Sequence, residues 1–299
     1  MLTGLSAFPL TPFAADGTVD EQTFTSLVER LVTAGVDSIA PLGSTGSYAY
    51  LRREERARLA RIAVEHAAGI PVMVSIGATR TRDVLALAED AQKAGVSAVL
   101  LAPVSYQGLT ADDVYGLYED VTRELSVPLT VYDNPDTTHV TFTEQLYQAV
   151  AALPNVASIK IPGVPADPAR ALAHVDRLRA LLPAHVTLGV SGDAYGAAGL
   201  IAGCAAWYSV VGGTLPRTAL AITRAVQTGD TAAAAAESAR LQPLWELSAR
   251  HGGSLRVIAA VAEHLGVVTA PSLPRPIRGL SGAGRAEVID VVERLGLTG

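Results

Sequence analysis

Lys160 is the residue of this sequence whose type and surroundings most strongly suggest chemistry. It lies in the segment VASIKIPGVP, next to Ile159 and Ile161. Such an apolar stretch predicts a buried strand, and a buried ammonium group loses hydration, which lowers its pKa. A neutral lysine can attack a carbonyl group and form a Schiff base, which arginine cannot do. A structural lysine paired with a carboxylate elsewhere in the chain is the alternative.

The composition gives Lys160 further weight. Of the 23 lysine and arginine residues, only Lys93 and Lys160 are lysine. Lys93 lies beside acidic residues in EDAQKAGVS, where a polar helix end and a solvated amine are expected. A chain that uses arginine almost everywhere else therefore retains a lysine in an apolar strand, and we expect a chemical role there.

A tyrosine ends the apolar run that precedes Lys160. PLTVYD places Tyr132 at the end of one predicted strand, and Lys160 lies at the end of the next. Neighbouring strands are about 4.8 Å apart, so the phenol and the amine could share one pocket floor. The phenol could then transfer protons. A core tyrosine with a satisfied hydroxyl group is the alternative.

A glycine-rich loop adds a possible anion site. In GSTGS, Gly43 and Gly46 permit tight turns, and the amides between them can form a nest that Ser44 and Thr45 supplement with hydroxyl groups. Such turns are common in loops. A carboxylate nest, an amine and a phenol are nevertheless the groups that a Schiff-base enzyme acting on a 2-oxo acid needs.

Eight short apolar runs could position these residues, and amphipathic segments separate several of them. Continuous apolar strands are typical of a parallel sheet covered on both faces. About eight such units predict an α/β protein with a (β/α)8 TIM barrel. A doubly wound open sheet is the competing architecture, although no GxGxxG follows the first run. The runs are 4–10, 38–43, 71–77, 97–103, 128–133, 156–160, 186–192 and 205–212.

The pattern changes after the eighth run. Residues 215–265 read as nearly all helical, with breaks at Gly229 and at Gly252-Gly253, and residues 284–296 read as a last helix. We therefore expect a barrel over 1–214 and a C-terminal helical extension over 215–299 that packs on it. This region could form an oligomer interface, or it could only pack against the barrel and stabilise it.

The composition argues against several classes of protein. Hydrophobic residues make up 49% and charged residues 17% of the chain, which argues against disorder. The net charge is -6, so a nucleic acid partner is not expected. The single Cys204 cannot form an internal disulfide and is expected to be buried. The sequence has no signal-peptide pattern and no long apolar span, which predicts a cytoplasmic protein without membrane contact.

Several motifs occur together in a fixed order: TPFAADGTVD (11–20), GSTGS (43–47), YDNP (132–135), SIKIPG (158–163), SGD (191–193) and RPIRGL (275–280). With them the sequence resembles, along nearly its whole length, the dihydrodipicolinate synthase/N-acetylneuraminate lyase superfamily of class I pyruvate-dependent aldolases.

The resemblance implies a (β/α)8 barrel, a homotetramer built as a dimer of dimers, and no metal or organic cofactor. It implies that Lys160 forms the Schiff base and that Tyr132 transfers protons with Ser44 as a relay hydroxyl. Substrate contacts are implied for the carboxylate loop, for the end of the tyrosine motif and for one backbone carbonyl: Ser44, Thr45, Gly46, Ser47, Thr137 and the carbonyl of Tyr208.

Departures from the family pattern bear on the second substrate. Lysine-pathway synthases usually carry an arginine, which grips aspartate semialdehyde, at the position of Thr137. They carry an interface tyrosine at the position of Ser105, with Tyr106 one step on here, and a glutamate at that of Ser47. A threonine hydroxyl does not replace a bidentate guanidinium. A polyol or sugar-acid tail, or a neutral aldehyde, suits this pocket better.

The sequence thus predicts a Schiff-base lyase acting on pyruvate or a 2-keto-3-deoxy sugar acid-like 2-oxo acid. The alternatives are a 4-hydroxy-tetrahydrodipicolinate synthase, a Schiff-base dehydratase of a keto-deoxy sugar acid, and a non-catalytic barrel that binds small acids. Two further residues each have two alternative roles. His139 is either a second proton carrier or a solvent-facing loop residue. Asp193 either orients the substrate tail or caps the following helix.

Overall fold

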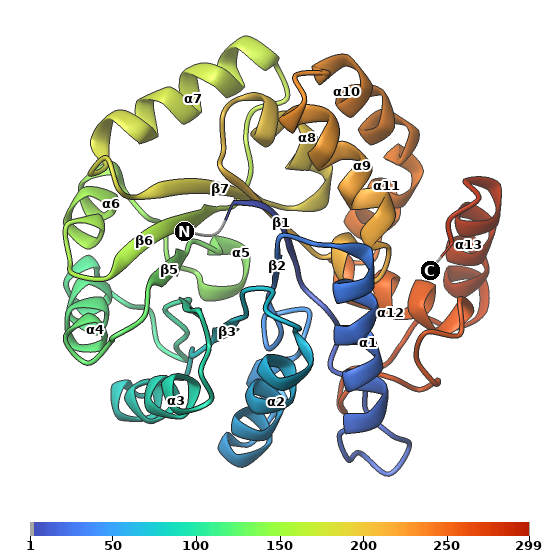
Figure 1. Cartoon of the computed structure of the whole chain (residues 1–299), viewed down its shortest axis with the longest axis horizontal. Helices are drawn as coiled ribbons and strands as arrows, with labels where there is room; N and C mark the ends of the chain where they lie inside the picture. The colour runs from blue at the N-terminus through green and yellow to red at the C-terminus, as the bar shows by residue number, and fades with distance from the viewer. Residues whose placement is uncertain (1–2, 299) are drawn as a thin grey trace.

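The computed structural model describes residues 3–298, and its centre is a ring of eight parallel strands (Figure 1). Neighbouring strands follow the order β2-β1-β8-β7-β6-β5-β4-β3, and a parallel bridge between Ile39 and Val72 joins the two ends. The strands are β1 (Gly4–Ala7), β2 (Ser38–Ile39), β3 (Met73–Ser75), β4 (Ala98–Leu101), β5 (Leu129–Tyr132), β6 (Val156–Ile161), β7 (Thr187–Ser191) and β8 (Ala206–Ser209).

Helices surround this ring, and further helices follow it at the C-terminal end. The helices that lie between the strands are α1 (Glu21–Ala34), α2 (Arg53–His66), α3 (Thr81–Lys93), α4 (Ala111–Arg123), α5 (Pro135–Thr138), α6 (Glu144–Ala151), α7 (Pro168–Leu181) and α8 (Gly196–Ile201), with the short 3₁₀ helices η1 (Tyr48–Tyr50) and η2 (Asp193–Tyr195). After β8 come η3 (Val211–Gly213), α9 (Pro216–Gln227), α10 (Thr231–Arg240), α11 (Gln242–Arg250), α12 (Ser254–His264) and α13 (Gly282–Arg294).

Helix α1 illustrates how the sequence encodes these elements. The Asp20 carboxylate accepts a hydrogen bond from the amide of Thr23 and so caps the first turn. Gly35 ends the helix in the left-handed region, at φ 74°. Between them Phe24, Leu27, Val28 and Leu31 form one buried face. These are the face and the end that the spacing of apolar residues predicts.

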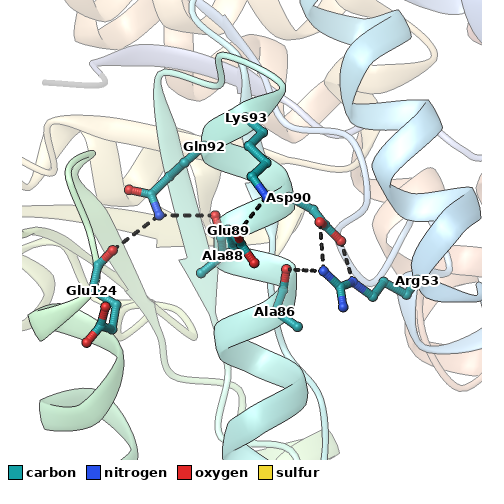
Figure 2. Close-up of polar contacts among 8 residues, drawn as sticks. All are labelled: Arg53, Ala86, Ala88, Glu89, Asp90, Gln92, Lys93 and Glu124. Atoms are coloured by element: carbon teal, nitrogen blue, oxygen red, sulfur yellow. Dashed lines mark hydrogen bonds and ion pairs between the residues drawn. The ribbon is translucent and has the colours of Figure 1, made fainter.

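The outer helices are tied to one another by polar contacts (Figure 2). Arg53 of α2 holds the Asp90 carboxylate of α3 through its Nε and Nη2 atoms, at 2.5 and 2.8 Å. Gln92 of α3 donates to the backbone carbonyl of Glu124, which directly follows α4. On the same helix Lys93 forms an ion pair with Glu89 at 2.6 Å. The bonds of Arg53 and Gln92 thus connect α3 with its two neighbours, α2 and the end of α4.

The barrel has two apolar clusters. The large one fills the space between strands and helices, as expected where a helical layer covers a parallel sheet. The small one fills the inside of the ring. It consists of Phe8, Ala40, Met73, Ala98, Leu100, Ala206 and Tyr208, with the partly buried Tyr132 against it.

The predicted (β/α)8 barrel with C-terminal helices is confirmed. Helix α9 contacts β1, α1 and α8, so it belongs spatially to the helical ring, whereas α11, α12 and α13 pack on one another beside it (Figure 1). The helical stretch predicted after residue 215 is observed, with breaks at both glycine positions. Within residues 3–298 no helix combines the length and the apolar character needed to cross a bilayer.

Candidate active site

Lys160 and Tyr132 lie side by side inside the barrel. The strands β5 and β6 are neighbours, and their register pairs these two residues directly. The Nζ atom of Lys160 is 4.0 Å from the centre of the Tyr132 ring, over its face. A cation over an aromatic face is attracted by the ring quadrupole, so the protonated amine is partly stabilised there. The strand arrangement predicted from sequence thus brings the amine and the phenol together.

The surroundings of Lys160 favour its neutral form. The residue is only 4% exposed, and the rings of Phe8 and Tyr208 lie 5.5 and 5.7 Å from its Nζ atom. Burial lowers the pKa of Lys160 to about 7, against the opposing effect of the Asp193 charge. A large fraction of the amine is therefore unprotonated near neutral pH, as a nucleophile requires.

Asp193 supplies the negative charge that acts on Lys160, and the end of β8 holds it. Its carboxylate accepts hydrogen bonds from the Ser209 hydroxyl at 2.9 Å and from the amides of Val210 and Val211 at 3.1 and 2.8 Å. Burial nevertheless raises the pKa of Asp193 above its ordinary value. Asp193 is thus bonded to the end of β8. The sequence analysis considered only two roles for it, orienting the substrate tail and capping the following helix, and did not include this contact.

A glycine next to Lys160 makes room inside the barrel. Gly189 of β7 is paired in register with Lys160. A Cβ atom at this position would lie 2.3 Å from the Tyr208 ring, so a side chain here would displace that ring. With glycine present, the Tyr208 hydroxyl lies 2.8 Å from the Ser158 hydroxyl. The ring of Tyr208 therefore forms part of the floor below the amine.

Tyr132 is linked to the glycine-rich loop. The nearby Ser44 side chain favours the ionised phenol, but burial dominates and raises the pKa of Tyr132 to about 12. The phenol therefore stays protonated near neutral pH and can donate a proton. Ser44 is exposed, so this contact connects the buried phenol with the open side of the loop. A phenol and a hydroxyl in contact can pass a proton between them.

The loop from Gly43 to Ser47 has the tight geometry that its glycines predict. A Cβ atom at Gly46 would lie 2.7 Å from the amide nitrogen of Leu42, and Ser47 adopts the left-handed region at φ 53°. Thr45 and Ser47 are buried. Within the described part of the chain, the Ser47 hydroxyl oxygen has no hydrogen-bond partner. A buried hydroxyl in this state is suited to contact a bound ligand.

The residues after Tyr132 divide into an exposed and a buried group. Thr137 on α5 and His139, which follows it, are both exposed. Asp133, in contrast, is buried and accepts a hydrogen bond from the Tyr147 hydroxyl of α6. Burial raises the pKa of Asp133 to about 6. The two ends of the segment with Thr137 are thus held together by a bond between Asp133, which directly follows β5, and α6.

Sequence reasoning missed the aromatic floor and the Asp133–Tyr147 pair. Phe8 directly follows β1 and could have been chosen by the rule that residues at strand ends face the site. Tyr208 was predicted to contribute through its carbonyl, whereas its ring lies near the amine. Cys204 is buried, as predicted. Burial raises the pKa of its thiol to about 12, so the side chain stays uncharged and packs as a small apolar group.

The fold and the buried amine define a class of protein: a (β/α)8 barrel with a lysine inside it. Residues 1–295 match the family model described as the dihydrodipicolinate synthetase family, and the chain belongs to that family. It is therefore a lyase of the class I, pyruvate-dependent aldolase type.

Individual relatives agree with this assignment. The chain is 31% identical over 245 residues to the 4-hydroxy-tetrahydrodipicolinate synthase of Azoarcus sp., with 81% of each chain covered. It is 33% identical over 136 residues to the enzyme of the same name from Bartonella bacilliformis, covering 46% of that protein. The crystal structure of dihydrodipicolinate synthase from Agrobacterium tumefaciens is 43% identical, with a TM-score of 0.93 and 98% of each chain covered.

Proposed function

We propose that Lys160 of this enzyme forms a Schiff base with pyruvate or with a longer 2-oxo acid. The amine adds to the C2 carbonyl, the carbonyl oxygen leaves as water, and loss of a C3 proton gives an enamine that attacks an aldehyde. In the reverse direction the same steps cleave a carbon–carbon bond. The observation that carries the proposal is the buried amine of Lys160, with a pKa of about 7, over the Tyr132 ring.

The neighbouring residues take roles in this scheme. Tyr132 and Ser44 move the protons that water loss and enamine formation require. Thr45, Gly46 and Ser47 bind the carboxylate of the 2-oxo acid through hydroxyl groups and amides, and the Tyr208 carbonyl contacts the bound substrate. The buried, unpartnered hydroxyl of Ser47, in the range 3–298, supports the assignment of this loop.

Two specific reactions compete for the second substrate. Similarity along most of the chain favours 4-hydroxy-tetrahydrodipicolinate synthesis from pyruvate and aspartate semialdehyde, the activity in the names of the relatives. The exposed Thr137, in place of an arginine, favours a 2-keto-3-deoxy sugar acid or a neutral aldehyde. Dehydration of such an acid through the same Schiff base is a variant of the second reaction.

The first experiment tests the Schiff base. The protein is incubated with pyruvate, reduced with borohydride, and its intact mass and the modified residue are determined. A pyruvyl adduct on Lys160 is the expected result. An unmodified protein would contradict the proposal and support the non-catalytic acid-binding barrel. An adduct on Lys93 or on the N-terminus would mean that another amine reacts.

The second experiment separates the two reactions. Turnover is measured with pyruvate plus aspartate semialdehyde and, in parallel, with 2-keto-3-deoxy sugar acids. A kcat on the order of 10 per second identifies a reaction at the rate of metabolic enzymes. Such a rate with aspartate semialdehyde supports the activity named for the relatives. Such a rate only with the sugar acids supports the selectivity inferred from Thr137.

We further propose a division into a barrel of 1–214 and a helical region of 215–299, a homotetramer built as a dimer of dimers, and a cytoplasmic location. The sequence and the family support these three proposals. Tyr106 bears on the tetramer, because its side chain is 93% exposed, next to the Ser105 position where the family usually has an interface tyrosine. Light scattering measures the oligomeric state.

A further inference from the structure

A hollow of about 300 Å³ lies between helices α1 and α9, on the outer layer of the barrel. Two arginines line it: Arg30 comes from the second half of α1 and Arg217 from the first turn of α9. It lies among helices and shares no lining residue with the site around Lys160. An inference about this hollow is therefore independent of the proposed function.

The guanidinium group of Arg30 is only partly hydrogen-bonded. Its Nη2 atom donates to the Thr214 carbonyl over a long distance of 3.4 Å. Its Nη1 atom is buried, and residues 3–298 offer it no acceptor. Neither Arg30 nor Arg217 forms an ion pair within the described chain. An unpaired buried donor destabilises the folded protein, and more so when the group is charged, so such a donor calls for an explanation.

The charges around the hollow add to this imbalance. Burial, and then the repulsion by Arg217, lower the pKa of Arg30. Glu29 also lines the hollow, but its carboxylate lies 2.9 Å from the His66 ring nitrogen on α2. Two neighbouring guanidinium groups thus face a single carboxylate that is turned to another partner. An anion between the arginines would offset their mutual repulsion.

Other donors at the hollow are partly committed. The hydroxyl groups of Ser26 and Thr33 donate to the carbonyls of Gln22 and Glu29 within α1. At the start of α9 the situation differs, because the N-cap residue Leu215 provides no side-chain hydrogen bond to the first turn. The positive end of the α9 dipole therefore adds to the charge of the two arginines.

We propose that this hollow binds a doubly charged oxyanion, namely a phosphate group. Arginine presents a planar fork of donors that matches phosphate oxygens, and two arginines balance two negative charges. The hollow, at about 300 Å³, is many times larger than the space that one water molecule needs, so it accommodates a phosphate with part of a larger molecule. The phosphate can be free or the terminal group of a small metabolite.

Thermal unfolding of the intact protein tests the site. Inorganic phosphate is added at constant ionic strength, balanced with sodium chloride, to wild type and to Arg30→Gln and Arg217→Gln. We expect saturating phosphate to raise the Tm of the wild type by several degrees, following mass action. Each of the two variants should lose most of this rise. Full retention of the rise in Arg30→Gln would overturn the proposal, as would the lack of any rise in the wild type.

Two control variants locate the effect. Arg61→Gln changes an exposed arginine of α2 outside the hollow, and Lys160→Met changes the candidate active site. Both should keep the phosphate-induced rise in Tm. Loss of the rise in Lys160→Met would place the anion in the barrel mouth and overturn the proposal. A rise in Tm that Arg61→Gln also loses would mean unspecific screening of surface charge and would overturn it as well.

A second readout separates lost binding from misfolding. Without phosphate, Arg217→Gln removes one of two repelling charges and should unfold at the same Tm as the wild type or higher. A variant that is more stable alone and unresponsive to phosphate is the signature of an anion site. Titration with glycerol 3-phosphate then identifies the source: tighter binding than inorganic phosphate indicates a phosphate ester, and equal binding indicates the phosphate group alone.

Discussion

Lys93 and Lys160, the two lysines of the chain, lie in opposite surroundings. The Lys93 side chain is 68% exposed at the end of α3, and its ammonium group pairs with Glu89 one turn earlier (Figure 2). Lys160 is 4% exposed on β6, among three aromatic rings and near the hydrogen-bonded Asp193. The same functional group is thus a solvated cation at one position and a partly neutral amine at the other.

This difference shows that the surroundings, rather than the residue type, set the state of a lysine side chain. The Lys93 side chain lies in water beside Glu89. Burial destabilises the charged form of Lys160, while the ring faces and Asp193 limit that destabilisation. Arginine could replace Lys93 because the contact there is purely electrostatic, whereas the chemistry proposed for Lys160 requires an amine.

Exchange of each lysine for arginine should have the largest effect. Lys160→Arg should abolish the borohydride-trapped pyruvyl adduct and turnover, because a guanidinium does not form the Schiff base. Lys93→Arg should leave both unchanged and is the matched control. Intact mass and steady-state turnover measure the outcome, and circular dichroism verifies folding. A trapped adduct in Lys160→Arg would show that the comparison assigns the chemistry to the wrong amine.

Tyr132→Phe should have the next largest effect. The substitution keeps the ring over which the amine lies but removes the hydroxyl that contacts Ser44. Because positioned proton transfer contributes about 10²–10⁴-fold, kcat should fall by about that factor. The lysine should still be modified by pyruvate, although more slowly. An unchanged kcat would mean that protons move by another route.

The rate of adduct formation should depend on pH around the pKa of Lys160, which is about 7. Below that value the rate should rise about tenfold per pH unit, because only the neutral amine attacks. Above it the rate should level off. Quenched-flow trapping with pyruvate between pH 5 and 9 measures the profile. A rate that keeps rising up to pH 9 would indicate an amine with the ordinary pKa of a surface lysine.

Stability should respond to the two lysines in opposite ways. The pKa of Lys160 is lower in the folded chain than in the unfolded chain, so folding releases a proton between about pH 7 and 10.5, and stability rises with pH there. Lys160→Met removes this dependence and should stabilise the protein by on the order of a few kcal/mol near pH 6. The gain should shrink towards pH 10. Urea unfolding at several pH values measures it, and a pH-independent difference would contradict the assignment.

Lys93→Met should have the smallest effect. It removes an exposed ion pair between residues one helical turn apart, with the acidic residue nearer the N-terminus, which stabilises helices by about 0.2–0.5 kcal/mol. Unfolding at low salt should show a loss of about this size, and higher salt should reduce it. A loss of more than about 1 kcal/mol would mean that Lys93 has a structural role beyond its ion pair.

The sequence was sufficient for those features that depend on local pattern and strand order. Eight apolar runs gave eight strands, and consecutive strands of a parallel barrel are neighbours, which is why Lys160 and Tyr132 were expected to meet. The glycine spacing predicted the turn that buries Thr45 and Ser47. In these cases the information lies within one or two adjacent units of the chain.

Contacts between distant segments could not be predicted in the same way. Arg30 reaches Thr214, which is 184 residues away, only because α1 and α9 lie side by side where the first strand pairs with the last. The bonds of Asp193 depend on the backbone conformation after β8, and the pairing of Asp133 with Tyr147 depends on the path of the intervening segment. Side-chain direction in irregular segments is set by tertiary packing, which residue spacing does not encode.

The bond between Asp133 and Tyr147 has a consequence for how this scaffold can change its substrate. It closes the segment that carries Thr137 into a loop that is anchored directly after β5 and on α6. The amine of Lys160 lies on another strand, β6. Substitutions between the two anchors can therefore reshape the segment that we propose to select the aldehyde, while the amine that we propose to form the Schiff base keeps its environment. In this architecture, reactivity and selectivity can evolve as separate modules.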